Sequence, residues 1–292
     1  MAESIHNTVH PPQVELRIFL LGSFRVCMGR GSSDGRTWRL RKAVTMLQIL
    51  SMTPGHHLHR DQLIDLLWPD TSPETAYNKF HQVLYIARRN LEELEPRVQG
   101  TDILKLNRHI VSLGVQGQVW TDVRAFEHAA RRATATGTIA DFNTAIECYT
   151  GDLLENEPYE DRFINHREAL RREFHRMLLG LSTLYLEHGD VGYAISVLER
   201  LLAKDPTLEE AHVRLMQLYA TAGLRYQAVA QYHALRSALH DEFAILPSPT
   251  SRKLYEAIVD GSFSTDRTVH HRHPSNRAIV TNASHDGPPC NL

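Results

Sequence analysis

The first third of the chain changes from strand-like to helix-like hydrophobic spacing. Apolar and polar side chains alternate over 14–19 (VELRIF) and again over 24–28 (FRVCM), which predicts two half-buried strands. The glycine-rich segment 29–35 predicts a turn, and from Arg41 onward apolar residues recur at helical spacing. Helices are predicted from 41 to Thr53-Pro54-Gly55, over 60–68 and over 73–94, and a hairpin over 103–106 and 110–113. Strands, three helices and a closing hairpin are the element order of a winged helix-turn-helix, an α+β fold.

No strand pattern follows Gly117, which predicts that the rest of the fold is all-α. Helices are predicted near 122–135, 139–150, 159–188, 190–204, 208–222, 224–242 and 249–260. Five residues recur 34 positions later, the period of tetratricopeptide repeats. They are Leu181, Tyr185, Gly189, Ala194 and Leu198, repeated as Leu215, Tyr219, Gly223, Ala228 and Tyr232. We expect the glycines to let paired helices turn closely, and the alanines to let them approach each other.

The third predicted helix, 73–94, has two distinct faces. An apolar stripe holds Ala76, Phe80, Val83, Leu84, Ala87, Leu91 and Leu94. Another line, with spacing i, i+4, i+7, i+11, holds Asn78, Gln82, Tyr85 and Arg89, with Thr75 and Lys79 beside it and Arg88 nearer the stripe. Asn, Gln and Arg are the side chains that pair bidentately with adenine and guanine in the major groove. A solvated helix face is the plainer interpretation, but the absence of Asp and Glu from this face between Thr75 and Glu92 favours a recognition helix.

The predicted hairpin offers a second group of polar residues. Lys105, Asn107, Arg108 and His109 lie in or near its turn, where a wing contacts the minor groove or the backbone. An ordinary polar hairpin tip fits these residues equally well. Arg39, Arg41 and Lys42 open the first helix and are either phosphate contacts or solvated side chains.

Charge and composition agree with a nucleic-acid module joined to a protein-binding module. Residues 1–115 carry a net charge of +3 and residues 116–262 of −6, within a total of −2. No apolar run approaches the roughly 20 residues of a membrane span, and the first residues have no signal-peptide pattern, so we expect a cytoplasmic protein. Cys27 and Cys148 are expected to be small core residues, and Cys290 a tail thiol.

Enzyme chemistry has no support in the sequence. Histidines cluster at 56, 57 and 59, in a predicted loop without a Cys or carboxylate partner at metal-ligand spacing. A second group, at 270, 271 and 273, lies in the predicted disordered tail. Neither a Gly-x-Ser-x-Gly nucleophile motif nor a phosphate-binding Gly-x-x-x-x-Gly-Lys-Ser/Thr loop occurs. We therefore expect no enzyme activity, no cofactor and no metal.

Seven segments along the chain form one recognisable series. They are LRIFLLGSFRV (16–26), WRLRKAVTMLQIL (38–50), HRDQLIDLLWPD (59–70), AYNKFHQVLYIARRNLEEL (76–94), TDVRAFEHAA (121–130), YTGDLL (149–154) and ILPSPTSRKLYEAI (245–258). In this order they resemble the bacterial transcriptional activator domain regulators of the Streptomyces antibiotic regulatory protein type. The resemblance implies an OmpR-like winged helix-turn-helix followed by a tetratricopeptide-like activator domain, promoter DNA and RNA polymerase as partners, and base or phosphate contacts from Asn78, Lys79, Gln82, Arg88 and Arg89. At the wing the chain departs from the family, since His109–Leu113 replaces a Gly-Tyr-Arg-Leu run.

These patterns predict three parts: a DNA-binding domain over 14–115, an activator domain over 120–260 and a disordered tail over 262–292. The predicted function is a sequence-specific DNA-binding transcription regulator, and the resemblance implies that it activates at promoter repeats and contacts RNA polymerase. A homodimer is expected because one recognition helix reads few base pairs and most such proteins need two half-sites. The alternative is a tetratricopeptide-like protein-interaction scaffold with a degenerate DNA-binding front. The missing phosphate-binding loop makes the chain either a short form of the family or the front of a longer regulator.

Overall fold

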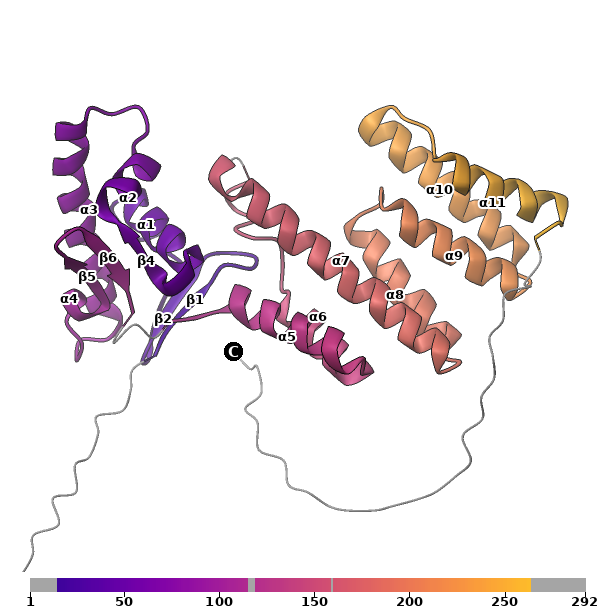
Figure 1. Ribbon diagram of the computed structural model, residues 1–292, viewed down its shortest axis with the longest axis horizontal. Helices are drawn as coiled ribbons and strands as arrows, with labels where there is room; N and C mark the ends of the chain where they lie inside the picture. The colour runs from indigo at the N-terminus through magenta and orange to yellow at the C-terminus, as the bar shows by residue number, and fades with distance from the viewer. Residues whose placement is uncertain (1–14, 115–118, 159, 264–292) are drawn as a thin grey trace, which may run out of the picture. The chain divides into compact units, whose positions relative to one another are not determined.

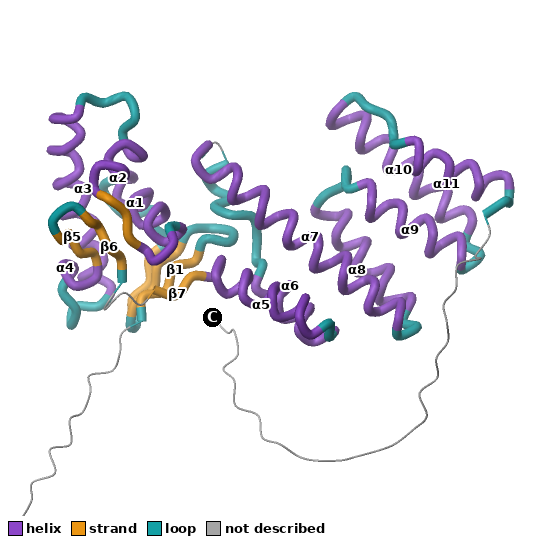
Figure 2. The backbone as a smooth tube through the Cα atoms, viewed as in Figure 1, coloured by secondary structure: helices purple, strands orange, loops and turns teal. Residues whose placement is uncertain are grey.

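The computed structural model describes residues 15–114, 119–158 and 160–263. Its chain divides into two compact units, Met1–Arg132 with Thr144–Phe174, and Ala133–Asn143 with His175–Leu292. The strands of both sheets come before α5, and the regular elements of the described residues after β7 are all helices (Figures 1 and 2). The predicted tail from 264 onward, Cys290 and the second histidine group lie outside the described residues, and the domain bounds 14–115 and 120–260 stay a prediction. The start of the tail at 262 was wrong, because Phe263 packs against a core cluster that contains Tyr232 and Ile258.

The first unit begins with a four-stranded sheet of order β3-β2-β1-β7. Its strands are β1 (Leu16–Phe19), β2 (Arg25–Met28), β3 (Gly31–Ser33) and β7 (Val119–Thr121). β2 is antiparallel to both β1 and β3, whereas β7 runs parallel to β1. The expectation that no strand follows Gly117 was therefore wrong. Three residues are too few to show alternation, and their pairing depends on a strand about a hundred positions earlier.

Four helices follow the first three strands. They are α1 (Arg41–Met52), α2 (Arg60–Leu67), α3 (Pro73–Leu94) and the short α4 (Gly100–Ile103). Helix α3 packs against β2 and β3 of that sheet. Leu16, Ile18 and Val26 from the sheet and Phe80 from α3 are fully buried. At Gly31 a Cβ atom would collide with the Leu94 carbonyl, so the β2–β3 turn lies directly against the last turn of α3. The glycine-rich segment thus serves close packing as well as the turn.

A second, three-stranded sheet of order β4-β6-β5 forms the wing. Its strands are β4 (His57–His59), β5 (Leu104–Asn107) and β6 (Ile110–Leu113), preceded by a 3-10 turn over Pro54–His56. The predicted hairpin is confirmed with its first strand moved by one residue. The first histidine group was wrongly placed in a loop: His57 and His59 lie in β4, which pairs with β6.

Part of the predicted activator domain also belongs to this first unit. After β7 come α5 (Asp122–Thr136), α6 (Ile139–Cys148), a 3-10 turn (Asp161–Phe163) and α7 (Ile164–Glu187). The division between the two units falls within each of these three helices. Backbone groups of Leu20 and Gly22 pair with those of Asp152, Leu154 and Glu155 at 2.8–3.0 Å. The turn between β1 and β2 is therefore fixed against the segment that follows α6.

Two polar contacts attach the start of α5 to the winged helix. The Asp122 carboxylate accepts hydrogen bonds of 2.9 Å from the backbone amides of Leu20 and Leu21. Arg124 Nη1 donates to Nε2 of the buried His56, whose Nδ1 lies 3.3 Å from the Leu50 carbonyl. This arrangement requires the His56 proton on Nδ1, and burial of the ring lowers the His56 pKa below its usual value.

The second unit contains the repeat. Its remaining helices are α8 (Val191–Lys204), α9 (Glu209–Thr221), α10 (Arg225–Phe243) and α11 (Pro249–Asp260). Figure 1 shows α10 beside α9, with α11 along α10. The turn after α7 and the turn after α9 have the same hydrogen bonds: Asp190 N donates to Tyr185 O, and Leu224 N donates to Tyr219 O, both at 2.8 Å.

Repeat residues fill equivalent places. Ala194, Leu198 and Ala228 are fully buried, as close helix approach requires, and Tyr232 is nearly so. Glycine occurs at these two repeat positions for a reason other than the expected close turn of paired helices. A Cβ at Gly189 or Gly223 would meet nothing within 4 Å, but their φ angles are +81° and +74°. Left-handed backbone at a helix C-terminus, and not close packing, selects glycine here.

The cysteine expectation was wrong in part. Both Cys27 and Cys148 are half-buried and not core residues. Cys27 lies on the outer face of the first sheet, where its Sγ is 3.3 Å from Ser32 Oγ.

Candidate nucleic-acid interface

The recognition-helix candidate, α3, follows α2 after a tight turn. Pro73 occupies its first turn and Ser72 its N-cap position, where the Ser72 hydroxyl bonds to Thr75 Oγ1 at 2.9 Å and not to a backbone amide. Six of the seven apolar stripe residues are buried, and Leu94 is half-buried. The stripe fixes the rotation of the helix about its axis, so the opposite face is turned to solvent.

The predicted polar line lies on that opposite face. Asn78, Gln82, Tyr85 and Arg89 are all exposed, as are Thr75 and Lys79. Tyr85 has 61% of its surface exposed, although it is a large aromatic residue. At 100° per residue the line lies about half a turn from the middle of the buried stripe. These side chains therefore point away from the protein as a continuous, cationic and amide-rich ridge.

Arg88 has a different environment from the rest of the predicted set. It is half-buried, and its Nε donates a 2.8 Å hydrogen bond to the Leu104 carbonyl at the start of β5. Burial lowers its pKa. A Cβ at Gly100 would lie 2.6 Å from the Arg88 carbonyl oxygen, so α4 packs closely on the same turn. The geometry gives Arg88 a supporting role between α3 and the wing.

The wing presents fewer free groups than its sequence suggested. Lys105 is half-buried, whereas Asn107 and Arg108 are exposed. Arg108 has a φ of +55°, in the left-handed region, at the first position of the two-residue turn. His109 stacks on His59 with ring centroids 5.6 Å apart, and its carbonyl accepts a 2.6 Å bond from the Arg60 amide. The hairpin tip is thus attached to the start of α2.

Two residues on the flank of α3 were missed from the sequence. Tyr77 is 41% exposed and contacts His81 edge-on, with ring centroids 4.6 Å apart, while the Arg60 guanidinium lies 5.0 Å from the Tyr77 ring centre. Their i, i+4 spacing beside the polar line could have identified Tyr77 and His81. The contact between Tyr77 and Arg60 of α2 joins two different helices, so the spacing of residues within α3 could not predict it.

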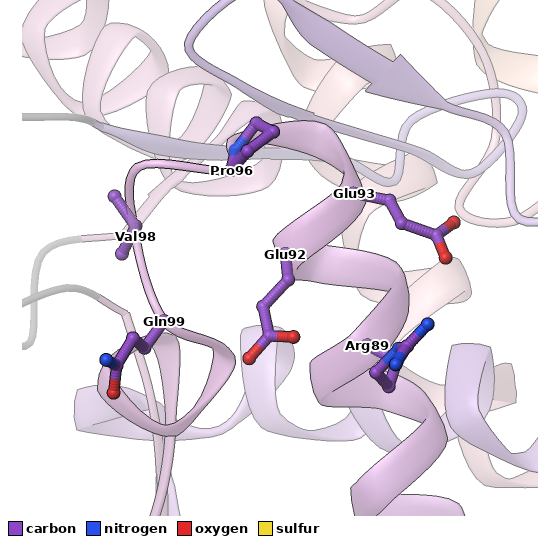
Figure 3. Close-up of a pocket in the computed structure, with 6 residues that line it drawn as sticks. All are labelled: Arg89, Glu92, Glu93, Pro96, Val98 and Gln99. Carbon is purple, nitrogen blue, oxygen red and sulfur yellow. The ribbon is translucent and has the colours of Figure 1, made fainter.

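The last turn of α3 marks the end of the ridge. A shallow depression of about 520 Å³ lies there, lined by Arg89, Glu92, Glu93, Pro96, Val98 and Gln99 (Figure 3). Glu92 Oε1 accepts a 2.8 Å hydrogen bond from the Gly100 amide, which gives this carboxylate a structural role. Because Glu92 and Glu93 repel phosphate, the part of α3 suited to nucleic acid extends from Thr75 to Arg89.

An exposed cationic ridge on the second helix of a helix-turn-helix, beside a wing, defines the class of winged-helix regulators. Within the described residues, no group of three or more metal-ligating side chains is present, and no helix is long and apolar enough to cross a membrane.

Comparison with known proteins shows which transcriptional regulators this winged-helix protein is similar to. The family model of the bacterial transcriptional activator domain matches residues 121–259. The transcriptional regulatory protein MoaR1 of Mycobacterium tuberculosis is 24% identical over 224 residues, covering 75% of this chain and 72% of MoaR1. The transcriptional regulator RedD of Streptomyces coelicolor is 25% identical over 237 residues, covering 78% of this chain and 67% of RedD.

A solved structure shares the fold. Mycobacterium tuberculosis EmbR, in complex with a low affinity phosphopeptide, superposes with a TM-score of 0.64 at 20% identity, covering 85% of this chain and 66% of EmbR. The chain is therefore a winged helix-turn-helix followed by a tetratricopeptide-like helical domain. Residues 121–259 match the bacterial transcriptional activator domain, and the chain is similar to transcriptional regulators of the Streptomyces antibiotic regulatory protein type.

Proposed function

We propose that the protein binds promoter DNA sequence-specifically through α3 and activates transcription by contacting RNA polymerase. The observation that carries the DNA-binding part is the exposed line of Asn78, Gln82, Tyr85 and Arg89 opposite the buried stripe of α3. Amide and guanidinium groups on such a face read base edges, while Lys79 and Thr75 beside them suit phosphate contacts. Activation rests on the family relationship.

The wing takes a smaller part in this proposal. Asn107 and Arg108 are free to reach the DNA backbone, whereas Lys105 is half-buried and Arg88 is engaged with Leu104. We assign base contacts to α3, backbone contacts to Asn107 and Arg108, and a supporting role to Arg88.

One recognition helix covers only a few base pairs, so two copies on a repeated site are part of the proposal. We place this activity in the cytoplasm and assign it no cofactor. The scaffold alternative predicts that residues 120–260 capture a protein partner while the chain has no DNA preference.

The test begins with mapping the genomic DNA bound by the full chain, followed by footprinting of the strongest site. The proposal expects a protected repeat upstream of a gene, and two protected half-sites if two copies bind. In-vitro transcription from that promoter should rise on addition of the protein. Uniform occupancy without a protected site would favour the scaffold alternative, and protection with lowered transcription would indicate a repressor.

A further inference from the structure

The outer face of the four-stranded sheet carries four large side chains in a regular arrangement. Arg17 and Phe19 from β1, Arg25 from β2 and Trp120 from β7 alternate with the buried residues Leu16, Ile18 and Val26. The register pairs Phe19 with Arg25 and Arg17 with Trp120. Side chains at paired positions lie on the same face of a sheet, so the four form one surface, which we name the arginine–aromatic face.

Contacts within the arginine–aromatic face hold the rings and guanidinium groups in place. The Arg25 guanidinium carbon lies 4.2 Å from the Phe19 ring centre, and that of Arg17 lies 5.9 Å from the Trp120 ring centre. The two rings are 5.2 Å apart and tilted by 58°. Each cation is thus positioned by an aromatic ring, while its N–H groups can still reach an acceptor.

This surface is open and carries net positive charge. Arg17 has 53% of its side chain exposed, Arg25 is exposed, and both rings are half-buried. Glu15 Oε2 accepts a 3.0 Å bond from Arg17 Nε, so one carboxylate already pairs with a guanidinium here. A second copy of the same face would bring Arg17 and Arg25 against their equivalents, which disfavours self-association through it.

The arginine–aromatic face is also separate from the DNA-binding ridge. The sheet's inner face packs on the helices, and the polar line of α3 is turned away from that core. A ligand on the outer face therefore leaves α3 accessible.

We propose that the arginine–aromatic face docks an acidic segment of a partner protein in which apolar side chains alternate with carboxylates. Carboxylates pair with the outward N–H groups of Arg17 and Arg25, and the apolar side chains cover Phe19 and Trp120. Enrichment of arginine and aromatic residues is typical of protein-binding surfaces. The proposal goes beyond DNA binding and does not depend on it.

The probe is a labelled synthetic peptide that repeats Glu-Leu, with a matched peptide that has Gln in place of Glu. Its binding to the full chain is measured by fluorescence anisotropy. The double variant Arg17→Glu/Arg25→Glu should weaken binding of the acidic peptide by roughly tenfold or more, as loss of two charge-assisted contacts implies. If the Arg17→Glu/Arg25→Glu variant does not fold, the milder variant Arg17→Gln/Arg25→Gln replaces it in the same measurement. Arg236→Glu/Arg252→Glu, on exposed positions of α10 and α11, is the matched control and should bind normally.

Four results would overturn the proposal. Equal binding of the Gln peptide would show that carboxylates are not recognised. Tighter binding of oligothymidylate, or loss of duplex DNA binding in the Arg17/Arg25 variants, would assign this face to nucleic acid. A change in sedimentation of the Arg17/Arg25 variants would assign it to a second copy of the chain.

Discussion

Arg88 Nε donates a 2.8 Å hydrogen bond to the carbonyl of Leu104, which connects the recognition-helix candidate α3 to the wing. The adjacent residue, Arg89, is exposed on the polar line. Two neighbouring arginines on one helix therefore have different roles, one in the fold and one in the proposed DNA contact.

This difference gives the first prediction. Arg88→Ala should lower the free energy of unfolding by about 1–2 kcal/mol, because it leaves a half-buried carbonyl without its donor. Arg89→Ala should change stability by less than about 0.5 kcal/mol and still weaken DNA binding. Urea unfolding followed by circular dichroism measures both. Equal stability losses for the two variants would contradict the assignment.

A second prediction concerns Glu157, which accepts from Nε2 of the buried Gln48 at 2.9 Å and from Arg41 Nη2 at 2.9 Å. Glu157→Ala leaves the Gln48 amide without its partner and should cost about 1–3 kcal/mol. In a Gln48→Leu background the same change should cost less, because no amide is left unsatisfied. A double-mutant cycle measures the difference, and additive effects would contradict a coupled pair.

A third prediction follows from Asp122. Burial raises the pKa of its carboxyl group to about 6, although the amides of Leu21, Leu20 and Val123 oppose the shift. Since the folded-state value exceeds the unfolded one, the folded protein binds more protons between the two. This contribution to stability is complete below the unfolded value and is lost as pH rises through about 6.

Wild type and Asp122→Asn should therefore diverge with pH. On acidification from about pH 7.5 to about pH 5, the stability of wild type relative to the variant should rise by about 1 kcal/mol. Chemical unfolding at the two pH values tests this. A difference between wild type and variant that does not change with pH would mean that Asp122 has an ordinary pKa in the folded protein.

The two glycines Gly223 and Gly192 provide a fourth prediction with opposite signs. Gly223 has a φ of +74°, so Gly223→Ala should destabilise by about 1 kcal/mol in spite of the open space around it. Gly192 lies within α8, and no atom lies within 4 Å of a Cβ placed there. Gly192→Ala should stabilise by about 0.5–1 kcal/mol. Thermal unfolding distinguishes them, and a loss at both positions would contradict the conformational explanation.

Long periodic elements were predictable from the sequence. The bounds of α3 are confirmed at 73–94, because a seven-residue apolar stripe, an early proline and a following proline all define the same helix. The repeat helices were likewise predicted to within a few residues. Helix α7 begins at Ile164 and not near 159, since a 3-10 turn precedes it.

Features that depend on distant partners had no local signal. β4 contains two histidines in three residues and forms only because β6 lies beside it. The bonds from Asp152 and Leu154 to the β1–β2 turn use backbone groups, which any sequence supplies. Helical spacing placed Arg88 nearer the apolar stripe than Arg89, but the hydrogen bond from Arg88 to Leu104 depends on the position of β5.

The central claim is that the polar face of α3 reads DNA sequence. Its most direct test is competition binding of the full chain to its footprinted site against a scrambled duplex, at several salt concentrations. Gln82→Ala and Arg89→Ala should each reduce the preference for the site by about 1–3 kcal/mol, and Lys79→Ala should weaken both duplexes and lower the salt slope by about 1. Arg236→Ala, on an exposed face of α10, is the control and should bind as wild type does. Unchanged preference in the Gln82 and Arg89 variants, or no preference in wild type, would contradict the account.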